Sequence, residues 1–322
     1  MNREKRNNLE LIFALKEQIV STLRPLISKK CIILDAPYYH NIGDVLIWAG
    51  EKALMEELGC ECIYTASYDT CKFPDIESDV TILFQGGGNI GDLYHEHPAF
   101  LLKVIEKYPH NRIIVCSQSV HYKDKRLQDR DLNALSKHRG LYFCGRDRET
   151  AELLGGYIGE RALCLPDMAF CIPSSKVELF KKKISKSHLY IERNDCEKAN
   201  IEINSDVEKH DWPSFDFSFR KSTFINKILS RLSKASLPLV HPLINMVWDK
   251  YAQSVFFNAM IKEGVEFISP YGYVSTTRLH GCILAILLDK EITFIDNSYG
   301  KNRRFYETWL TNLETLRFYE NK

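Results

Sequence analysis

Val80-Thr-Ile-Leu-Phe-Gln-Gly-Gly-Gly-Asn-Ile-Gly-Asp92 joins an apolar run to a glycine-rich stretch, and it decides the fold class. An apolar run before a glycine cluster predicts a buried strand that ends in a turn. The tetrapeptide Asn-Ile-Gly-Asp occurs also at Asn41–Asp44, after the run Cys31-Ile-Ile-Leu-Asp-Ala-Pro37. We expect both copies to form turns that open helices. Such turns present backbone N–H groups and a positive dipole end, which suit anionic ligands.

Outward from this motif, strand and helix patterns alternate along the N-terminal half of the chain. The predicted strands are 31–36, 60–65, 80–85, 112–117, 141–144 and 162–165, and the predicted helices are 8–28, 44–58, 97–108, 128–138 and 148–155. Short apolar strands that alternate with helices predict an α/β fold with a parallel sheet.

A second alternation follows a linker that we predict between residues 173 and 186. Its predicted strands are 188–192, 265–269 and 292–296, and its predicted helices are 247–263, 277–288 and 302–314. The 322 residues are thus expected to form two Rossmann-like domains, 1–175 and 176–322. Ligands of such folds bind where strands end, and we expect the site in a cleft between the domains.

The segment 217–248 is predicted to be a basic insertion in the C-terminal domain. It contains no acidic residue, and its cations alternate with apolar residues, of which 225, 228, 229 and 232 fit one helical face. One interpretation is an interfacial helix over about 219–235 that contacts a membrane peripherally. The alternative is an amphipathic helix packed on its own domain.

Composition excludes several classes of protein. Lys and Arg number 43 against 42 for Asp and Glu, a net charge of +1, so we expect no nucleic-acid partner. The ten cysteines show no zinc-site spacing, and no metal is expected. No run approaches the roughly 18 apolar residues of a membrane span, and no apolar signal core follows Met1. These features predict a reduced, cytoplasmic protein.

The glycine cluster has two interpretations. Gly86, Gly88 and Gly91 match the dinucleotide fingerprint G-x-G-x-x-G after a strand, but the next strand leads into Gln118-Ser119, where a dinucleotide enzyme needs an acidic residue. The alternative is that the backbone of Gly86, Gly87, Gly88 and Asn89 approaches an anion or a sugar closely, or packs against a neighbouring loop. We favour the contact with an anion or sugar.

Two arginine motifs carry further candidates. Arg146 follows the strand 141–144 and opens a helix, where a local Arg–Asp pair is the structural alternative. Ser275-Thr-Thr-Arg-Leu-His-Gly281 precedes an apolar helix, where an unpaired Arg278 would be costly to bury. Arginine binds phosphate or carboxylate through two hydrogen bonds. His280 is the candidate proton donor.

In their order and spacing, these motifs resemble the polysaccharide pyruvyl transferase family. The matching pieces are Asn41–Asp44, Gly86–Asp92, Arg146-Asp147, Pro166-Asp167, Thr277–Gly281 and Asp296–Lys301, over about residues 31–305. The resemblance implies an architecture similar to GT-B glycosyltransferases. It also implies transfer of pyruvate from phosphoenolpyruvate to two hydroxyls of a surface or capsular polysaccharide, or of its lipid-linked repeat unit. The product is a cyclic ketal, and no cofactor is implied.

The resemblance also implies roles for individual residues. Arg146 and Arg278 would hold phosphate and carboxylate, and His280 would be the acid. Asp44 or Asp92 would accept a proton from the attacking hydroxyl or orient the sugar. The remaining candidates for substrate contacts are Asn41, Gly43, Gly86, Gly87, Gly88, Asn89, Arg193 and Lys301.

Two other functions fit the same architecture. A nucleotide-sugar glycosyltransferase would need a site for base and ribose, for which no motif is found. A non-catalytic sugar-binding relative would not need an intact Arg278 and His280.

Overall fold

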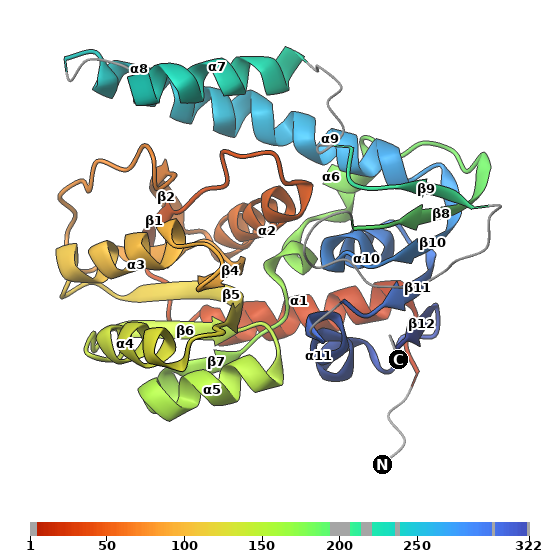
Figure 1. Cartoon of the computed structure of the whole chain (residues 1–322), viewed down its shortest axis with the longest axis horizontal. Coiled ribbons are helices and arrows are strands. Elements are labelled where there is room, and N and C mark those ends of the chain that lie inside the picture. Colours follow the sequence, from red (N-terminus) through yellow and green to blue (C-terminus); the bar gives the residue numbers. More distant parts are fainter. Residues whose placement is uncertain (1–4, 194–206, 214–220, 236–238, 298–299, 321–322) are drawn as a thin grey trace. The chain divides into compact units, whose positions relative to one another are not determined.

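A computed structural model describes residues 5–193, 207–213, 221–235, 239–297 and 300–320 (Figure 1). The chain divides into two compact units. Unit 1 comprises residues 1–15, 38–46 and 172–322, and unit 2 comprises 16–37 and 47–171. The helices α1 (Asn8–Leu23) and α2 (Ile42–Leu58) each contribute residues to both units. The first Asn-Ile-Gly-Asp copy therefore belongs to unit 1, together with the C-terminal half of the chain.

Unit 2 contains a parallel sheet with the order β2-β1-β3-β5-β6-β7, in which β4 pairs with β5. Its strands are β1 (Lys30–Leu34), β2 (Glu61–Ala66), β3 (Thr81–Phe84), β4 (Gly87–Gly91), β5 (Ile113–His121), β6 (Leu141–Gly145) and β7 (Ala162–Cys164). Its connecting helices include α3 (Glu96–Lys107), α4 (Lys125–Ser136) and α5 (Arg148–Ile158). The predicted α/β class with parallel strands is confirmed for this unit.

The second Asn-Ile-Gly-Asp copy differs from its prediction. Gly87–Gly91 forms the strand β4 instead of a turn that opens a helix, and the next helix, α3, begins only at Glu96. The reason is the backbone of Gly91, with φ +156°, which lies so close to β5 that a β-carbon would stand 1.9 Å from the His121 carbonyl oxygen. Only glycine allows that approach.

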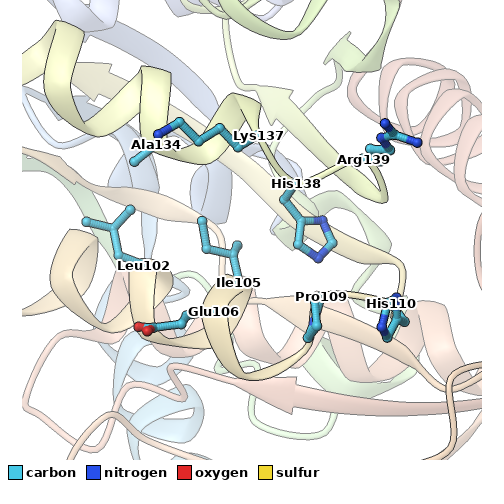
Figure 2. A pocket seen from close by; sticks show the side chains of 9 residues that line it. All are labelled: Leu102, Ile105, Glu106, Pro109, His110, Ala134, Lys137, His138 and Arg139. Carbon is cyan, nitrogen blue, oxygen red and sulfur yellow. The ribbon is translucent and has the colours of Figure 1, made fainter.

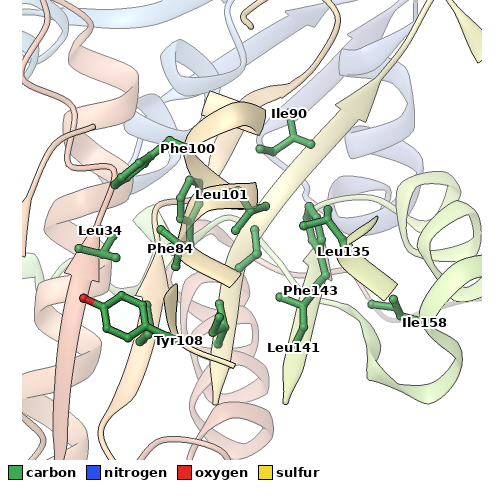
Figure 3. Packing of buried hydrophobic residues seen from close by; sticks show 14 of the residues in the cluster. Leu34, Phe84, Ile90, Phe100, Leu101, Tyr108, Leu135, Leu141, Phe143 and Ile158 are labelled. Carbon is green, nitrogen blue, oxygen red and sulfur yellow. The ribbon is translucent and has the colours of Figure 1, made fainter. Parts of the chain in front are cut away.

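One hydrophobic cluster of unit 2 lies between its sheet and the helices α3, α4 and α5 (Figure 3). Phe84 of β3 and Phe143 of β6 are fully buried, and Phe100 and Leu101 of α3 pack in the same cluster. The apolar runs of the central strands are buried along their whole length, as expected of a parallel sheet covered by helices. Their carboxyl ends are thus held in fixed positions.

Unit 1 contains a second parallel sheet, with the order β12-β11-β10-β8-β9. Its strands are β8 (Lys186–Ile191), β9 (Glu208–His210), β10 (Tyr271–Thr276), β11 (Glu291–Ile295) and β12 (Leu316–Tyr319). Its helices are α6 (Ser174–Glu178), α7 (Lys221–Ala235), α8 (His241–Tyr251), α9 (Phe257–Ile268), α10 (Leu279–Leu287) and α11 (Lys301–Phe305). Residues 252–256 and 306–310 form π-helical turns. Strands and helices alternate in this half as predicted, although one predicted strand is displaced.

One strand of unit 1 was misplaced by the sequence analysis. Residues 265–268 of the predicted strand 265–269 form the end of α9, and the strand is β10, Tyr271–Thr276, where no strand was predicted. The helix continues because Ile261, Val265 and Ile268 are buried at helical spacing. Gly272 does not interrupt β10, since it lies between two residues, Tyr271 and Tyr273, that both pair with β8.

Much of the predicted basic insertion is a pair of helices, α7 and α8, while residues 217–220 and 236–238 lie outside the described part. The two helices pack side by side (Figure 1). Hydrogen bonds join Ser222 to Tyr251, Asn226 to Trp248 and Ser233 to Asn245. The residue numbers rise along α7 as they fall along α8, so the two helices run antiparallel. Among the described helices, none combines the length and the apolar character that crossing a bilayer requires.

Candidate active site

The carboxyl edge of the unit 1 sheet gathers most of the C-terminal candidates. Because all its strands are parallel, the residues after β8, β9, β10 and β11 emerge at one edge. Arg193 follows β8, Asp211 follows β9, Arg278 follows β10, and Asp296 follows β11. The chain order reverses between β8 and β10, which is the switch point where open α/β sheets bind ligands.

Thr277 ties the switch point together. Its backbone N–H donates to the Ile191 carbonyl over 3.1 Å, and its Oγ1 accepts the Arg193 N–H over 3.0 Å. The Asn302 side-chain amide donates to the carbonyls of Thr277 and Ile295, both over 2.8 Å. The ends of β8, β10 and β11 are therefore joined directly, which keeps the Arg278 backbone rigid.

Arg278 lies at the N-terminus of α10 and forms a two-point ion pair with Asp211. Nη2 donates to Oδ2 over 2.7 Å, and Nε donates to Oδ1. Both side chains are almost fully buried. The Arg278 N–H donates to Thr276 Oγ1 over 3.0 Å. The Asp211 carboxylate compensates the positive charge of the buried Arg278 side chain, and the two hydrogen bonds fix the plane of the guanidinium.

The first Asn-Ile-Gly-Asp copy starts α2 as predicted. Asn41 Oδ1 accepts the Gly43 N–H over 3.0 Å, which is the geometry of an N-cap. Asp44 is buried in the first turn, and its Oδ2 accepts hydrogen bonds from Asn41 Nδ2 over 2.8 Å and from the Tyr39 hydroxyl over 2.9 Å. The carboxylate is thus oriented by side chains at the positive end of the helix.

The structure brings His280 onto this turn. A β-carbon built on Gly43 would lie 2.3 Å from His280 Nδ1 and 2.7 Å from its Cγ, so the imidazole rests against the Gly43 α-carbon. Gly43 is therefore needed for the approach of a ring from a helix more than two hundred residues away. Gly281 has a similar role, because a β-carbon there would meet Thr276 Oγ1 at 2.6 Å.

Lys301 and its loop lie at the end of β11. The Lys301 N–H donates to Asn297 Oδ1 over 2.7 Å, and Asp296 Oδ1 accepts N–H bonds from Asn297 and Arg303. Burial raises the pKa of Asp296, against the lowering effect of those two N–H groups. Lys301 is half-buried at the first position of α11. The structure places it at the same sheet edge as Arg278.

In unit 2, the first of the three glycines is held by Glu51 of α2. The Gly86 N–H donates to Glu51 Oε1 over 2.9 Å, and the side chain of Glu51 is fully buried. Burial raises the pKa of Glu51 to about 8, with smaller contributions in the same direction from Asp167 and Asp35. A β-carbon on Gly86 would stand 2.8 Å from the Ser117 carbonyl oxygen. Gly86 is therefore fixed between α2 and β5.

The following residues are more open. Gly87 is buried with φ +135°, whereas Gly88 and Asn89 are half-buried. Gln118 of β5 secures this segment: its Oε1 accepts the Asn89 N–H over 3.3 Å, and its Nε2 donates to the Gln85 carbonyl over 2.9 Å. Gly88 and Asn89 are thus the part of the glycine cluster that a ligand can reach.

Arg146 is engaged in a buried ion pair. Its Nη1 donates to Asp167 Oδ2 over 2.8 Å, and its Nε and Nη2 donate to Ser119 Oγ over 3.2 Å. Arg146 is 1% exposed and Asp167 is 0% exposed. Breaking such a pair typically costs about 3–5 kcal/mol. Asp147, the expected local partner of Arg146, instead caps α5 by accepting the Thr150 N–H over 2.8 Å.

Asp92 follows β4 and binds backbone groups. Its Oδ2 accepts the N–H groups of Lys123 and Asp124, over 2.6 and 2.9 Å. Burial raises its pKa, but these N–H bonds outweigh that effect, and the pKa of Asp92 lies below its usual value. Asp92 also lines a small pocket of about 220 Å³ together with Tyr122 and Arg130.

A larger pocket of about 660 Å³ lies between α3 and α4 (Figure 2). Its lining includes Pro109 and His110 before β5, and His138 and Arg139 before β6. These residues precede the strands, so the pocket is at the amino edge of the sheet, whereas ligands of such sheets bind at the carboxyl edge. None of the nine lining residues belongs to the predicted site.

Three residues that hold the candidates in place were missed or given no role by the sequence analysis. Asp211 pairs with Arg278, Asp167 pairs with Arg146, and Glu51 holds Gly86. Glu51 had a detectable signal, because it lies on the same helical face as Ile47 and Leu54. Asp211 follows a three-residue strand and carries no pattern. Among the described residues, no group of three His, Cys, Asp or Glu side chains is arranged to hold a metal ion.

Comparison with known proteins assigns the class. The family model for polysaccharide pyruvyl transferase matches residues 41–299. The chain therefore belongs to the polysaccharide pyruvyl transferase family, and the resemblance stated from its motifs is confirmed.

Individual relatives agree with this assignment. The chain is 30% identical over 321 residues to EpsO of Bacillus subtilis, provisionally named a pyruvyl transferase, with 95% of this chain and 94% of that protein covered. It is 25% identical over 294 residues to pyruvyl transferase 1 of Schizosaccharomyces pombe, with 88% of this chain and 70% of that protein covered. A crystal structure of a functionally uncharacterized Klebsiella pneumoniae protein matches with a TM-score of 0.66 and 20% identity, covering 95% and 98%. That last likeness concerns the fold.

Proposed function

We propose that this protein transfers pyruvate from phosphoenolpyruvate to two hydroxyls of a sugar, as a cyclic ketal with release of phosphate. The acceptor is a surface or capsular polysaccharide or its lipid-linked repeat unit. The observation that carries the proposal is the contact of His280 with Gly43, which brings a proton donor onto the helix start that contains Asp44. Membership of the pyruvyl transferase family supports the reaction class.

The donor's charges suit the residues of unit 1. Phosphoenolpyruvate carries a carboxylate and a phosphate, and both favour arginine and helix N-termini. Arg278 at the start of α10 is the proposed principal anion contact, with Asn41 and Gly43 offering the N-terminus of α2. Arg193 and Lys301, which emerge at the same sheet edge, are proposed as further phosphate contacts.

The proposed chemistry needs one acid and one base. His280 gives a proton to the methylene carbon of phosphoenolpyruvate, which leaves an oxocarbenium-like centre on the neighbouring carbon. The first sugar hydroxyl attacks that centre and passes its proton to Asp44. The second hydroxyl then replaces the phosphate, which leaves with its bonding electron pair and takes up the remaining proton. One donor and two hydroxyls thus give one ketal and one inorganic phosphate.

In unit 2, the accessible backbone of Gly88 and Asn89 is proposed as a contact for a sugar or an anion. Gly86 and Gly87 shape this segment, and Arg146 holds the neighbouring strand β5 through its bond to Ser119 and through its N–H, which donates to the Gln118 carbonyl. Asp92 is proposed to hold the loop after β5 and not to act as the base, because both of its bonds are to backbone N–H groups of that loop, whereas Asp44 is held by side chains on the turn that His280 contacts. A GT-B-like arrangement, a cytoplasmic location and the absence of a cofactor and of nucleic-acid partners stay predictions.

The test is a reaction with a defined donor. The purified chain is incubated with phosphoenolpyruvate and polysaccharide repeat units, and both released phosphate and acceptor mass are measured. We expect phosphate release that depends on the acceptor, and an acceptor heavier by one pyruvate less one water. Parallel reactions with nucleotide sugars test the glycosyltransferase alternative. Transfer of a sugar in those reactions, with no pyruvate gained from phosphoenolpyruvate, would refute the proposal.

Arg278→Lys sharpens the assignment of the anion contact. Lysine keeps the positive charge but offers no two-point geometry, so it should raise the KM for phosphoenolpyruvate about tenfold or more. Its matched control is Arg304→Lys, on the opposite end of α11 from Lys301, which should leave this KM within about twofold. An unchanged KM in Arg278→Lys would contradict the role given to the guanidinium.

A further inference from the structure

The pair of helices α7 and α8, here called the hairpin, buries three polar side chains beside Trp248 and exposes six apolar ones. Asn226, Ser233 and Asn245 are almost fully buried. The exposed apolar side chains are Phe224 (47% exposed), Ile228 (37%) and Leu232 (48%) on α7, and Leu243 (58%), Met246 (56%) and Val247 (46%) on α8. A helix that packs on a protein core normally shows the reverse arrangement.

Hydrogen bonds establish which face of each helix points inward. Trp248 Nε1 donates to Asn226 Oδ1 over 2.8 Å, and Ser233 Oγ donates to Asn245 Oδ1 over 2.6 Å. Asn226 Nδ2 donates to the Tyr38 carbonyl over 2.9 Å. These buried polar groups have partners, so the inward face meets its hydrogen-bonding needs. The apolar residues are therefore left on the outward face by a specific packing arrangement.

The outward apolar residues form a strip with cations along its sides. Phe224, Ile228 and Leu232 follow one another at intervals of four, which places them on one face of α7. The exposed Lys227 and Arg231 lie three residues beyond Phe224 and Ile228, so they border the same face. No acidic residue occurs between 217 and 248. Asp249, near the end of α8, is the one acidic residue of the two described helices, against five cations, Lys221, Lys227, Arg231, Lys234 and Lys250. An apolar strip bordered mainly by cations fits the interface of a bilayer, which is apolar in its interior and carries anionic headgroups at its surface.

We propose that the hairpin docks on an anionic lipid bilayer, with the apolar strip in the interface and the cations at the level of the lipid phosphates. Long basic side chains can reach the phosphates while their stems cover apolar surface. A second copy of this chain is the less suitable occupant, because two such surfaces would bring cations against cations. This docking surface goes beyond the proposed reaction and does not depend on it.

Docking would also place part of the site near the membrane. The inner face of the hairpin binds Tyr38, three residues before Asn41, and the Tyr38 and Trp248 rings lie 5.5 Å apart. The hairpin is thus attached to the segment that leads into α2. If the proposed function holds, this arrangement suits an acceptor that is carried on a lipid.

Co-sedimentation of the full chain with vesicles tests the proposal. We expect binding to vesicles of phosphatidylcholine mixed with phosphatidylglycerol, and much weaker binding to phosphatidylcholine alone. Raising sodium chloride to about 0.5 M should weaken binding, because it screens the attraction between cations and headgroups. Equal binding to the two kinds of vesicle, or none to either, would overturn the proposal whatever the reaction assay shows.

Paired variants assign the binding to the hairpin. Ile228→Ser with Leu232→Ser should weaken vesicle binding about tenfold or more, since both side chains leave the interface. The matched control, Leu179→Ser with Ile184→Ser, removes two exposed apolar side chains of unit 1 outside the hairpin and should bind as the wild type does. A hairpin variant that binds like its control would overturn the proposal.

Charge variants give an independent measurement. Lys221→Gln with Arg231→Gln should weaken binding roughly 25-fold, about fivefold for each cation. Arg24→Gln with Lys29→Gln, exposed cations of unit 2, should leave binding unchanged. Light scattering without lipid completes the test. A dimer that the hairpin variants convert to monomers, with unchanged vesicle binding, would show that a second copy is the occupant and overturn the proposal.

Discussion

The two copies of Asn-Ile-Gly-Asp adopt different structures and bind different groups. Asn41–Asp44 begins the helix α2, while Asn89–Asp92 lies in and just after the strand β4. Asp44 accepts bonds from side chains, Asn41 and Tyr39, whereas Asp92 accepts bonds from two backbone N–H groups. Identical tetrapeptides thus differ in role, the first contacting His280 and the second fixing a loop. The contacts that each copy makes in the folded chain go with these roles, Gly43 with His280 and Gly91 with His121.

The glycines explain the difference. Gly43 lies in the first turn of α2, and its missing side chain makes room for the His280 ring. Gly91 has φ +156° and lies against the His121 carbonyl of a neighbouring strand. The helical copy is followed by Val-Leu-Ile-Trp, which continues the helix, and the other copy follows three glycines that favour extended backbone. The expected consequences of substitution differ accordingly.

Gly91→Ala should have the largest effect. Its methyl group would lie 1.9 Å from a backbone oxygen that cannot move without disturbing β5. We expect a loss of more than about 4 kcal/mol in the free energy of unfolding, measured by urea denaturation. Gly155→Ala in α5 is the control, because a β-carbon there meets no atom of the described residues within 4 Å, and it should stabilise by about 0.5–1 kcal/mol. Equal effects of the two changes would refute the steric explanation of β4.

Glu51→Gln tests how the strand copy is supported. Burial raises the pKa of Glu51 from its ordinary value to about 8. Between about pH 4.5 and 8, the folded chain therefore keeps a proton on Glu51 that the unfolded chain has already lost. Its contribution to stability is therefore complete below pH 4.5 and is lost as the pH rises through 8.

Gln keeps the acceptor for the Gly86 N–H but does not ionise. We expect the wild type to lose on the order of 4 kcal/mol of unfolding free energy between about pH 5 and 9 through this group, and Glu51→Gln to lose correspondingly less. Thermal denaturation across this pH range is the measurement. Parallel pH profiles for the two proteins would contradict the assigned protonation of Glu51.

Asp44→Asn and Asp92→Asn separate the two carboxylates. If Asp44 is the base, its loss should lower acceptor-dependent turnover about a hundredfold. Asp92→Asn should lower the free energy of unfolding by about 1 kcal/mol, because an amide oxygen accepts hydrogen bonds from the Lys123 and Asp124 N–H groups less strongly than a carboxylate does. The same change should lower turnover less than tenfold. The reverse order of the two rates would exchange the roles proposed for the two copies.

Gly43→Ala should have the smallest effect of the series. Its methyl group meets a side chain, His280, which can move by a rotamer change, and alanine favours a helix over glycine by about 1 kcal/mol. We therefore expect a free energy of unfolding within about 1 kcal/mol of wild type and a roughly tenfold lower turnover. Full turnover in this variant would show that the position of the imidazole does not matter.

The sequence predicted the fold class because the strand and helix patterns of the chain are strong where side chains are buried. It misplaced β10, because Val265, Phe267 and Ile268 are apolar residues that suit a strand as well as the last turn of a helix. In addition, Gly272 is a residue type that commonly marks turns. It also gave β4 the wrong structure, since the approach of Gly91 to His121 is a tertiary contact that no local pattern contains.

The candidate residues were predictable, but their partners were not. Arg278 and His280 share one short motif, and the contact of His280 with Gly43 follows only from folding. Asp211 reaches Arg278 from a three-residue strand after a segment of the chain without a recognisable pattern. Partners separated by tens of residues, as Arg278 and Asp211 are, lie outside any local periodicity.

His280→Gln tests the central claim most directly, namely that the helical copy of the motif and this imidazole form the proton-donating part of a pyruvyl transfer site. The measurement is acceptor-dependent phosphate release from phosphoenolpyruvate, beside the exposed control His110→Gln. We predict a rate lower by about a hundredfold or more for His280→Gln, with an unchanged thermal midpoint, and a wild-type rate for the control. Phosphate release by His280→Gln at the rate of the control would contradict the account.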